Sequence, residues 1–269
     1  MTLELKGVSY RYAGSTRMAL ADIDLTVDTG TVVGVMGAGE AGKSTLCLVA
    51  AGLAPGTIGG HLLGSVTIDG IATVGARPFE LAQRCGIVFQ NPATQLSATS
   101  PTVWEEIAFG PRNLSLPLSE VIARTETAAA TLGINDLLPR DPSRLSGGQA
   151  QLVALAAVIA MRPAHLILDE PTAQLDPAGT RLVADAVAAL AAAGTAILIT
   201  EQKPDLIERI SQRVVVLDAG RIVLDGDAKA ILRDPHLREL GVAEPSDVRL
   251  HRLATEAGLD PARLTVVQP

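Results

Sequence analysis

The stretch GAGEAGKST, Gly37–Thr45, decides the fold of this chain. It satisfies the pattern G-x-x-x-x-G-K-[ST], in which Gly37 and Gly42 let the backbone curl and turn its N–H groups toward a phosphate. Such a match arises by chance on the order of once in a hundred chains of this length, so its surroundings must decide. An apolar, β-branched run at Thr31–Met36 precedes it, and the helix-forming Ser44–Leu53 follows. Strand, glycine loop and helix together predict a P-loop.

The loop predicts separate roles for its side chains. We expect Lys43 to reach the outer phosphates as a point charge, and the Ser44 hydroxyl to ligate the magnesium ion that accompanies a nucleoside triphosphate. Glu40 brings a carboxylate into the cradle, but its side chain can point outward while its N–H faces the phosphate. The expected nucleotide-binding residues of the loop are Gly37, Ala38, Gly39, Glu40, Ala41, Gly42, Lys43, Ser44 and Thr45.

Composition limits the class of protein. The 269 residues are 48% hydrophobic and 19% charged, which is enough apolar material for one large folded domain, with or without an appendix. A net charge of -7 and the lack of a basic run argue against a nucleic-acid partner. Cys47 and Cys85 have no metal-ligand spacing, so we expect buried thiols in a reducing compartment, the cytosol.

Neither a secretory signal nor a membrane span is expected. The start, MTLELKGVSYRY, has no basic stretch followed by an apolar core. The most apolar region, Val183–Thr200, is broken by Asp185 and Gly194 into a helix and a strand. Each piece is shorter than the ~20 apolar residues that cross a bilayer.

The order of elements predicts an α/β fold. Strands are expected at Leu3–Tyr10, Ile23–Val27, Val32–Met36, Val66–Ile68 and Gly86–Phe89. A helical stretch at Pro101–Leu138 and a helix at Gly148–Met161 follow, and then LILD, a helix at Ala178–Ala193, AILIT, a short helix near Asp205, RVVVLD and RIVLD. Strands separated by helices need right-handed crossovers, so the sheet should be mainly parallel. The closely spaced N-terminal strands should form antiparallel structure.

An apolar strand at HLILDEP, His165–Pro171, ends in two carboxylates. Asp169 is placed to hold magnesium, and Glu170 to act as general base toward an attacking water. An acidic turn at the end of a strand is common, so this stretch gains its meaning from the P-loop upstream.

A second anion site is expected in RLSGGQAQLVALAAVIAM, Arg144–Met161. Ser146, Gly147 and Gly148 stand where a helix should begin, so free N–H groups, the helix dipole and the Ser146 hydroxyl would attract an anion. Alone, these residues could be an ordinary serine N-cap followed by glycines. The complete LSGGQ string followed by LILDEP is more specific.

These stretches resemble the motifs of the ATP-binding cassette of ABC proteins. Gly37–Thr45 looks like Walker A, LSGGQ like the signature and LILDEP like Walker B. Gln90 in VFQNP resembles the Q-loop glutamine, AQLD at Ala173–Asp176 the D-loop, and Tyr12 the aromatic residue that stacks on adenine. The resemblance covers about Leu3–Asp227.

The resemblance implies a P-loop NTPase fold with a RecA-like sheet, an antiparallel β subdomain and a helical subdomain at about 101–162. The cassette would span 1–227, and 228–269 would form a C-terminal extension. Two cassettes would meet head to tail, each ATP lying between the Walker motifs of one chain and Ser146, Gly147, Gly148 and Gln149 of the other. The Mg²⁺ ligands would be Ser44, Gln90 and Asp169. The residues that serve hydrolysis would be Glu170, Gln202 and Gln90.

Within the ABC family, QNPATQLSATSPTVWEEIAFGPRNL at Gln90–Leu114 resembles energy-coupling-factor (ECF) and cobalt-type importer ATPases. Their Q-loop region typically reads QNP-x-x-Q-L and then T-V-x-E-[ED]-[IV]-A-F-G-P. A membrane subunit would dock there, and Gln90 would transmit the nucleotide state to it. The tail at Leu237–Leu259 resembles the extension that contributes to dimer contact in those ATPases. An ordinary helical insert and a frayed tail are the plainer interpretations.

The ECF resemblance implies uptake of a vitamin or a transition-metal ion at the cytoplasmic face of the cell membrane. The partners would be a transmembrane coupling subunit, a substrate-binding membrane subunit, and a second ATPase that is either a copy of this chain or a paralogue. The alternative functions for this chain are the ATPase of another ABC transporter, a soluble ABC ATPase acting on DNA or ribosomes, and a P-loop nucleotide kinase. LSGGQ disfavours the kinase, and a single cassette without a long insertion disfavours the soluble ATPase.

Two positions depart from the family pattern. Gly39 and Glu40 stand where Asn and Gly are frequent, although related ECF ATPases often carry acidic residues in this loop. Gln202 stands where a switch histidine is expected, if TEQ is aligned with the T-E-H of the family. A glutamine can hydrogen-bond a γ-phosphate but cannot carry a protonic charge.

Overall fold

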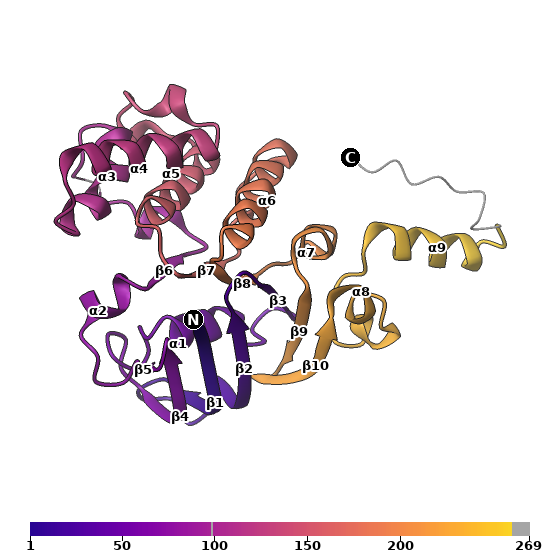
Figure 1. Cartoon of the computed structure of the whole chain (residues 1–269). Helices are drawn as coiled ribbons and strands as arrows, with labels where there is room; N and C mark the ends of the chain where they lie inside the picture. The colour runs from indigo at the N-terminus through magenta and orange to yellow at the C-terminus, as the bar shows by residue number, and fades with distance from the viewer. Residues whose placement is uncertain (98, 260–269) are drawn as a thin grey trace.

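A computed structural model of the protein describes residues 1–97 and 99–259. Residue 98, within the expected docking segment, and residues 260–269, at the end of the expected extension, lie outside this description. The central sheet has the order β10-β9-β3-β8-β7-β6 (Figure 1). Its strands are β3 (Val32–Met36), β6 (Cys85–Val88), β7 (His165–Asp169), β8 (Ala196–Thr200), β9 (Arg213–Asp218) and β10 (Arg221–Asp227). All neighbours are parallel except β9 and β10, which confirms the expected mainly parallel sheet.

Each face of the central sheet is buried in its own hydrophobic core. Successive side chains of a strand point to opposite faces, so Leu166 and Leu168 of β7 belong to one cluster and Ile167 to the other. A strand covered on both faces needs apolar residues at every position, which is why VVGVM and HLILD are recognisable in the sequence.

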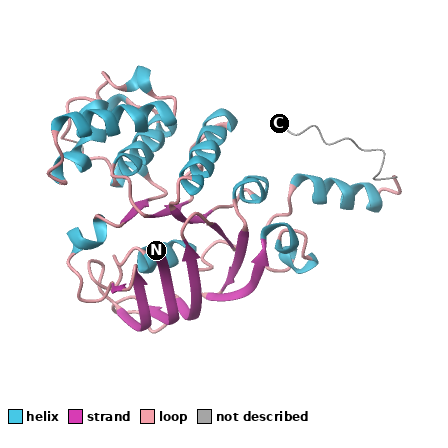
Figure 2. Ribbon diagram, viewed as in Figure 1, coloured by secondary structure: helices cyan, strands magenta, loops and turns pink. Residues whose placement is uncertain are grey.

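A smaller antiparallel sheet covers one face of the central sheet together with α1 (Lys43–Ala50) (Figure 2). Its order is β2-β1-β4-β5, formed by β1 (Thr2–Arg11), β2 (Leu20–Asp28), β4 (His61–Ile68) and β5 (Ile71–Ala72). The expected antiparallel N-terminal structure is confirmed. β4 begins five residues before the predicted Val66, because the first half of the strand is largely exposed and shows no apolar alternation.

Helices cover the other face and form a separate group beside it (Figure 1). They are α3 (Val103–Asn113), α4 (Leu118–Thr131), α5 (Gly147–Ala160), α6 (Pro177–Ala192), α7 (Pro204–Ile210) and α8 (Ala228–Ile231). By contrast, α2 (Pro78–Ala82) packs through Leu81 in the core on the α1 side, and α9 (Ser246–Glu256) lies beyond α8 (Figure 1). The stretch expected to be helical over 101–138 is two helices, since Pro117 stands at the start of α4 and cannot continue α3. The sequence reading assigned no helix at α2, α8 or α9. Every helix within 1–97 and 99–259 is too short or too polar to span a bilayer.

Candidate functional site

Three adjacent parallel strands bring the predicted site residues to one edge of the central sheet. The P-loop follows β3, Asp169 ends β7, and Thr200 ends β8 directly opposite Asp169. The carboxyl ends of parallel strands are where α/β sheets bind ligands. A cavity of about 490 Å³ opens at this edge. It is lined by Tyr12, Ser15, Arg17, Met18, Ala19, Gly39, Glu40, Gly42, Lys43, Ser44, Thr45, Gln90, Glu170, Gln202, Ala219 and Gly220.

Glycines give the P-loop a shape that other residues could not adopt. Gly37 has φ 156, and a Cβ there would lie 2.4 Å from the Leu217 carbonyl oxygen. Gly42, which begins α1, has φ 106, and a Cβ there would lie 2.9 Å from the Ala19 carbonyl oxygen. Glu40 takes a left-handed φ of 63 although it has a side chain, which is uncommon for a residue other than glycine. Its side chain is exposed at the cavity, as expected for a carboxylate turned away from the phosphate nest.

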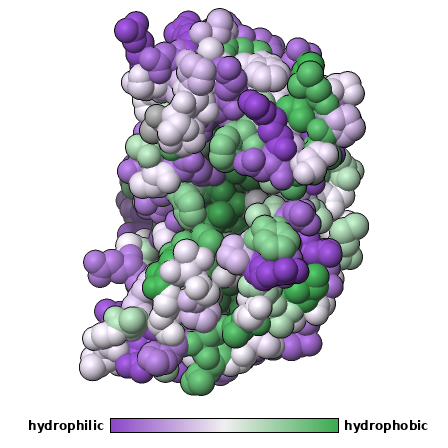
Figure 3. Space-filling view, turned by 90° about the vertical axis from the view of Figure 1, so that its left-hand side faces the viewer, coloured by the Kyte–Doolittle hydropathy of each residue, from purple (hydrophilic) through white to green (hydrophobic). Residues whose placement is uncertain are grey.

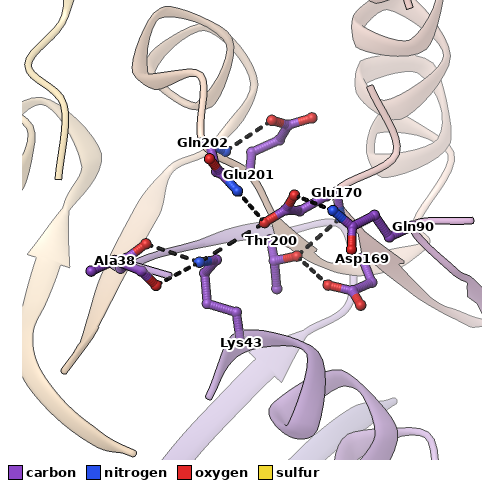
Figure 4. Close-up of polar contacts among 9 residues, drawn as sticks. Ala38, Lys43, Gln90, Asp169, Glu170, Thr200, Glu201 and Gln202 are labelled. Carbon is purple, nitrogen blue, oxygen red and sulfur yellow. Dashed lines mark hydrogen bonds and ion pairs between the residues drawn. The ribbon is translucent and has the colours of Figure 1, made fainter. Parts of the chain in front are cut away.

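Lys43 is buried inside the loop. Its Nζ donates to the carbonyl oxygens of Gly37 at 2.9 Å and Ala38 at 3.0 Å, and lies 3.9 Å from Oε1 of Glu170 (Figure 4). The ammonium group is therefore held between the loop and the carboxylate. Phosphate oxygens would be stronger acceptors than these neutral carbonyls, because hydrogen bonds between ionised groups are roughly twice as strong.

Glu170 is the centre of the polar cluster. Its Oε1 accepts a hydrogen bond from Nε2 of Gln202 at 2.8 Å, and its Oε2 accepts one from Nε2 of Gln90 at 2.8 Å (Figure 4). Its backbone has a left-handed φ of 47, and its N–H donates to the carbonyl oxygen and the hydroxyl of Thr200. The structure therefore brings together the three side chains that sequence reasoning named as catalytic.

Asp169 lies deeper than Glu170. Its Oδ1 accepts a hydrogen bond from the Thr200 hydroxyl at 2.8 Å. Burial raises the pKa of Asp169, although the hydroxyls of Thr200 and Ser44 and the charge of Lys43 oppose this rise. A carboxylate beside a serine hydroxyl supplies the oxygen ligands that Mg²⁺ prefers. These residues fit a magnesium ion.

Tyr12 lies at the rim of the cavity. Its hydroxyl and that of Thr45 are 3.1 Å apart and share a hydrogen bond. Its ring packs edge-on against Tyr10, with 5.0 Å between ring centroids. The side chain is thus fixed from two sides beside the P-loop.

The LSGGQ residues lie elsewhere on the molecule. Ser146 caps α5 by accepting from the N–H of Gln149 at 3.3 Å, while Gln149 Oε1 accepts from the N–H of Ser146 at 3.0 Å. Ser146 and Gly147 are exposed, and Gly147 faces Gln174, since a Cβ at Gly147 would lie 2.4 Å from Oε1 of Gln174. Within the described part of the chain, none of residues 146–149 lines the cavity.

Sequence reasoning missed several residues of the site. Thr200 is the most important, because it contacts both Asp169 and the backbone of Glu170. Its position at the end of AILIT, beside a parallel strand that ends in Asp169, was the available signal. Other missed residues line the cavity from loops outside the motifs, namely Ser15, Arg17, Met18, Ala19, Ala219 and Gly220.

Comparisons with known proteins agree with this geometry. Residues 20–173 match the family model described as ABC transporter. The chain is 40% identical over 250 residues to the energy-coupling factor transporter ATP-binding protein EcfA of Methanosarcina acetivorans, covering 92% of this chain and 88% of the relative. It is 36% identical over 250 residues to a Pyrococcus abyssi relative named as an ABC transporter ATP-binding protein, covering 92% and 89%.

A solved structure shows the same fold. It is cbiO1 from Clostridium perfringens, described as part of the ABC transporter complex cbiONQ. The TM-score is 0.77 at 30% sequence identity, and the match covers 96% of this chain and 98% of that one. The similarity therefore includes the region beyond the family match.

Proposed function

We propose that this chain, which belongs to the family of ABC transporter ATP-binding proteins and is an ATPase of that family, powers an ECF-type importer of a vitamin or a transition-metal ion. The observation that carries the finer assignment is the 40% identity to EcfA over 92% of the chain. The 30% identity to cbiO1 and the QNPATQL segment support it. An ATPase of another ABC transporter and a soluble ABC ATPase are the competing outcomes.

The chemistry of the proposed site follows from its groups. Glu170 is the general base that would take a proton from the attacking water, and such a base typically contributes about 10²- to 10⁴-fold to a rate. Mg²⁺ held by Ser44, Asp169 and Gln90 would neutralise charge on the phosphates. Lys43 would exchange the carbonyls of Gly37 and Ala38 for phosphate oxygens. Tyr12 would stack on the adenine at the cavity rim.

A second cassette is proposed to complete the site. In this arrangement Ser146, Gly147, Gly148 and Gln149 of the partner would contact the triphosphate from the open side of the cavity. The exposure of Ser146 and Gly147 at the start of α5 supports this role. The partner is either a second copy of this chain or a paralogous ATPase.

The docking of membrane subunits is proposed for the side of the molecule that carries α2 and α3. This side is hollowed, and hydrophobic residues gather in the hollow (Figure 3). Phe79 of α2 and Phe109 of α3 are 55% and 53% exposed, which is high for phenylalanine. The two residues lie on either side of Gln90 in the sequence, which supports a role for the Gln90 segment in the coupling to a docked subunit. Location at the cytoplasmic face of the cell membrane follows from this docking.

We also propose the division of the chain into a cassette at 1–227, with a helical subdomain at about 101–162, and an extension at 228–269. The end of the last strand, β10, at Asp227 supports the boundary. Among the described residues, α8 and α9 follow it and add no strand to the central sheet, although Ala228 of α8 packs in the core on that sheet.

Purification of the tagged chain from detergent-solubilised membranes of its own host tests the proposed function. We expect a polytopic coupling subunit and a substrate-binding membrane subunit to co-purify in fixed proportion and to raise the rate of ATP hydrolysis. Isolation with ribosomes or nucleic acid, and without membrane proteins, would favour the soluble ATPase. Co-purification with paired permease subunits and a separate extracytoplasmic binding protein would indicate another type of ABC transporter.

A further inference from the structure

Gln95 follows the short 3₁₀ helix Pro92–Thr94 and turns back toward β6. Its Oε1 accepts a hydrogen bond from the N–H of Phe89 at 3.1 Å, and its Nε2 donates to the carbonyl oxygen of Ile87 at 3.0 Å. One side chain therefore satisfies two backbone groups on either side of Val88. The QNP-x-x-Q-L pattern contains this glutamine but gives it no role.

The position of β6 explains why these two groups need a partner. β6 is the outermost strand of the central sheet, and its only strand neighbour in the described structure is β7. The backbone of Arg84 faces β7, because its carbonyl oxygen accepts a hydrogen bond from the N–H of His165. The backbone N–H and C=O groups of every second residue, beginning with the one after Arg84, therefore point away from β7. Ile87 and Phe89 are among those alternate residues. The Gln95 amide thus takes the place that another strand would occupy.

A second glutamine holds the same segment from the helical side. Gln151 of α5 is 1% exposed, and its Nε2 lies 3.4 Å from the carbonyl oxygen of Phe89. α5 is the helix that begins with the LSGGQ residues. Phe89 is therefore bound at its N–H by Gln95 and at its carbonyl by the signature helix.

We infer that Gln95 is a positioning residue for ATP hydrolysis, and that it acts by fixing the backbone of Phe89 so that Gln90 meets Glu170. Gln90 follows Phe89 directly, and its Nε2 lies 2.8 Å from Oε2 of Glu170. This inference rests on the proposed role of Gln90 and Glu170. A displacement of about 1 Å at a reacting group can cost on the order of 10²-fold in rate, so loss of this anchor should be measurable.

Substitutions of Gln95 test the inference through steady-state ATPase kinetics. Gln95→Met keeps the length of the side chain and removes both hydrogen bonds, and we expect kcat to fall about tenfold while KM changes by less than about twofold. Gln95→Glu keeps the acceptor for Phe89 and loses the donor for Ile87, so it too should lower kcat. The matched control is Gln212→Met. The Oε1 of Gln212 accepts from the N–H of Val32 at 2.8 Å, at the end of β3 away from the cavity, so its kcat should stay at the parental value.

A double substitution separates positioning from simple stabilisation. If Gln95 acts through Gln90, then Gln90→Ala/Gln95→Met should be no slower than Gln90→Ala alone. Additive losses, or parental kcat in Gln95→Met and Gln95→Glu, would overturn the inference and leave the proposed function intact. Parental kcat in Gln90→Ala would overturn both the role of Gln90 and the inference. Thermal midpoints of all variants identify any loss that comes from unfolding.

Discussion

At the scale of single residues, the proposed hydrolysis of ATP depends most on how the carboxylate of Glu170 is held. Both oxygens of its carboxylate accept hydrogen bonds from amide groups, one from Gln90 and one from Gln202. Two such donors hold the carboxylate in a fixed orientation. Each carboxylate oxygen keeps a further acceptor site, so Glu170 can accept a hydrogen bond from the attacking water while both glutamines stay bound. The glutamines therefore set the orientation of the proposed base.

Replacement of Glu170 by Gln should separate nucleotide binding from hydrolysis. The amide has the shape of the carboxylate but cannot accept the proton, so we expect hydrolysis to fall about 10²- to 10⁴-fold. Phosphate release under saturating ATP gives the rate, and equilibrium binding of a fluorescent ATP analogue gives the affinity. Binding should stay within a few-fold of the parental value. Parental turnover in this variant would assign the base to another group.

Replacement of Gln202 by His should accelerate hydrolysis. Gln202 Nε2 is 2.8 Å from Glu170, which places the residue at the site, but a neutral amide donates a weaker hydrogen bond to a γ-phosphate than an imidazolium does. A bond to a charged partner contributes about 1.5 to 3 kcal/mol against about 1 for a neutral one, so the gain could approach tenfold.

The Gln202→His comparison should be made on the purified chain and on the full complex. A several-fold increase in either setting supports a weakened switch. An unchanged rate in both settings would show that Gln202 is a competent substitute or is not at the switch position.

At the scale of elements, the start of α5 is the second half of the proposed site. Gly147→Glu should abolish hydrolysis, because a carboxylate there would repel the partner's triphosphate. The Cβ clash with Gln174 is with the end of a flexible side chain, so the fold should accommodate it. Gly147→Gln is the control of similar size without charge and should retain more activity. Loss of nucleotide binding by a dilute, monomeric Gly147→Glu sample would contradict action across an interface.

A partly buried pair links the two sheets at the opposite side of the fold from the cavity. Asp69 lies in the turn between β4 and β5. Its Oδ1 is 2.9 Å from Nε2 of His165, which stands at the start of β7. The N–H of Thr2 also donates to it at 3.0 Å. Burial by itself would raise the pKa of Asp69, but the hydrogen bonds from His165 and Thr2 and the charge of His165 outweigh it and lower that pKa. The pair therefore ties the antiparallel sheet to the strand that carries Asp169.

Asp69→Asn should destabilise the protein in a pH-dependent way. A carboxyl group with a lowered pKa stabilises the fold above its ordinary value of 3.8, and this contribution is lost as the pH falls through the lowered pKa. We expect the free energy of unfolding to drop by about 1.5 to 3 kcal/mol at pH 7 and the difference to shrink below pH 4. Urea unfolding from pH 7 to pH 3 measures this. Asp24→Asn, which removes the charge from an exposed acceptor for the N–H of Gly7, is the control. An equal loss at every pH would refute the electrostatic account.

At the scale of the whole molecule, sequence patterns predicted what depends on neighbours along the chain. Buried strands such as β3 and the glycine loop after it are local features, and they were placed correctly. Contacts between distant segments were not predictable. Gln90 meets Glu170 across 80 positions of sequence, and Thr200 meets Asp169 across 31, because the strand order brings their ends together. Gln95 was visible in a motif, but its role depends on β6 being an edge strand.

The proposed mechanism requires ATP to bind between two cassettes. The most direct test is the mass of the Glu170→Gln chain in solution, measured by light scattering with ATP and with ADP. The measurement with ATP is repeated on a double variant that also carries Gly147→Glu. With ATP, we predict a dimer of about twice the monomer mass, formed by two copies of this chain or by this chain and a paralogous ATPase that co-purifies. With ADP, or when the chain also carries Gly147→Glu, we predict the monomer mass. A chain that binds ATP but keeps the monomer mass in every combination would contradict the head-to-tail site.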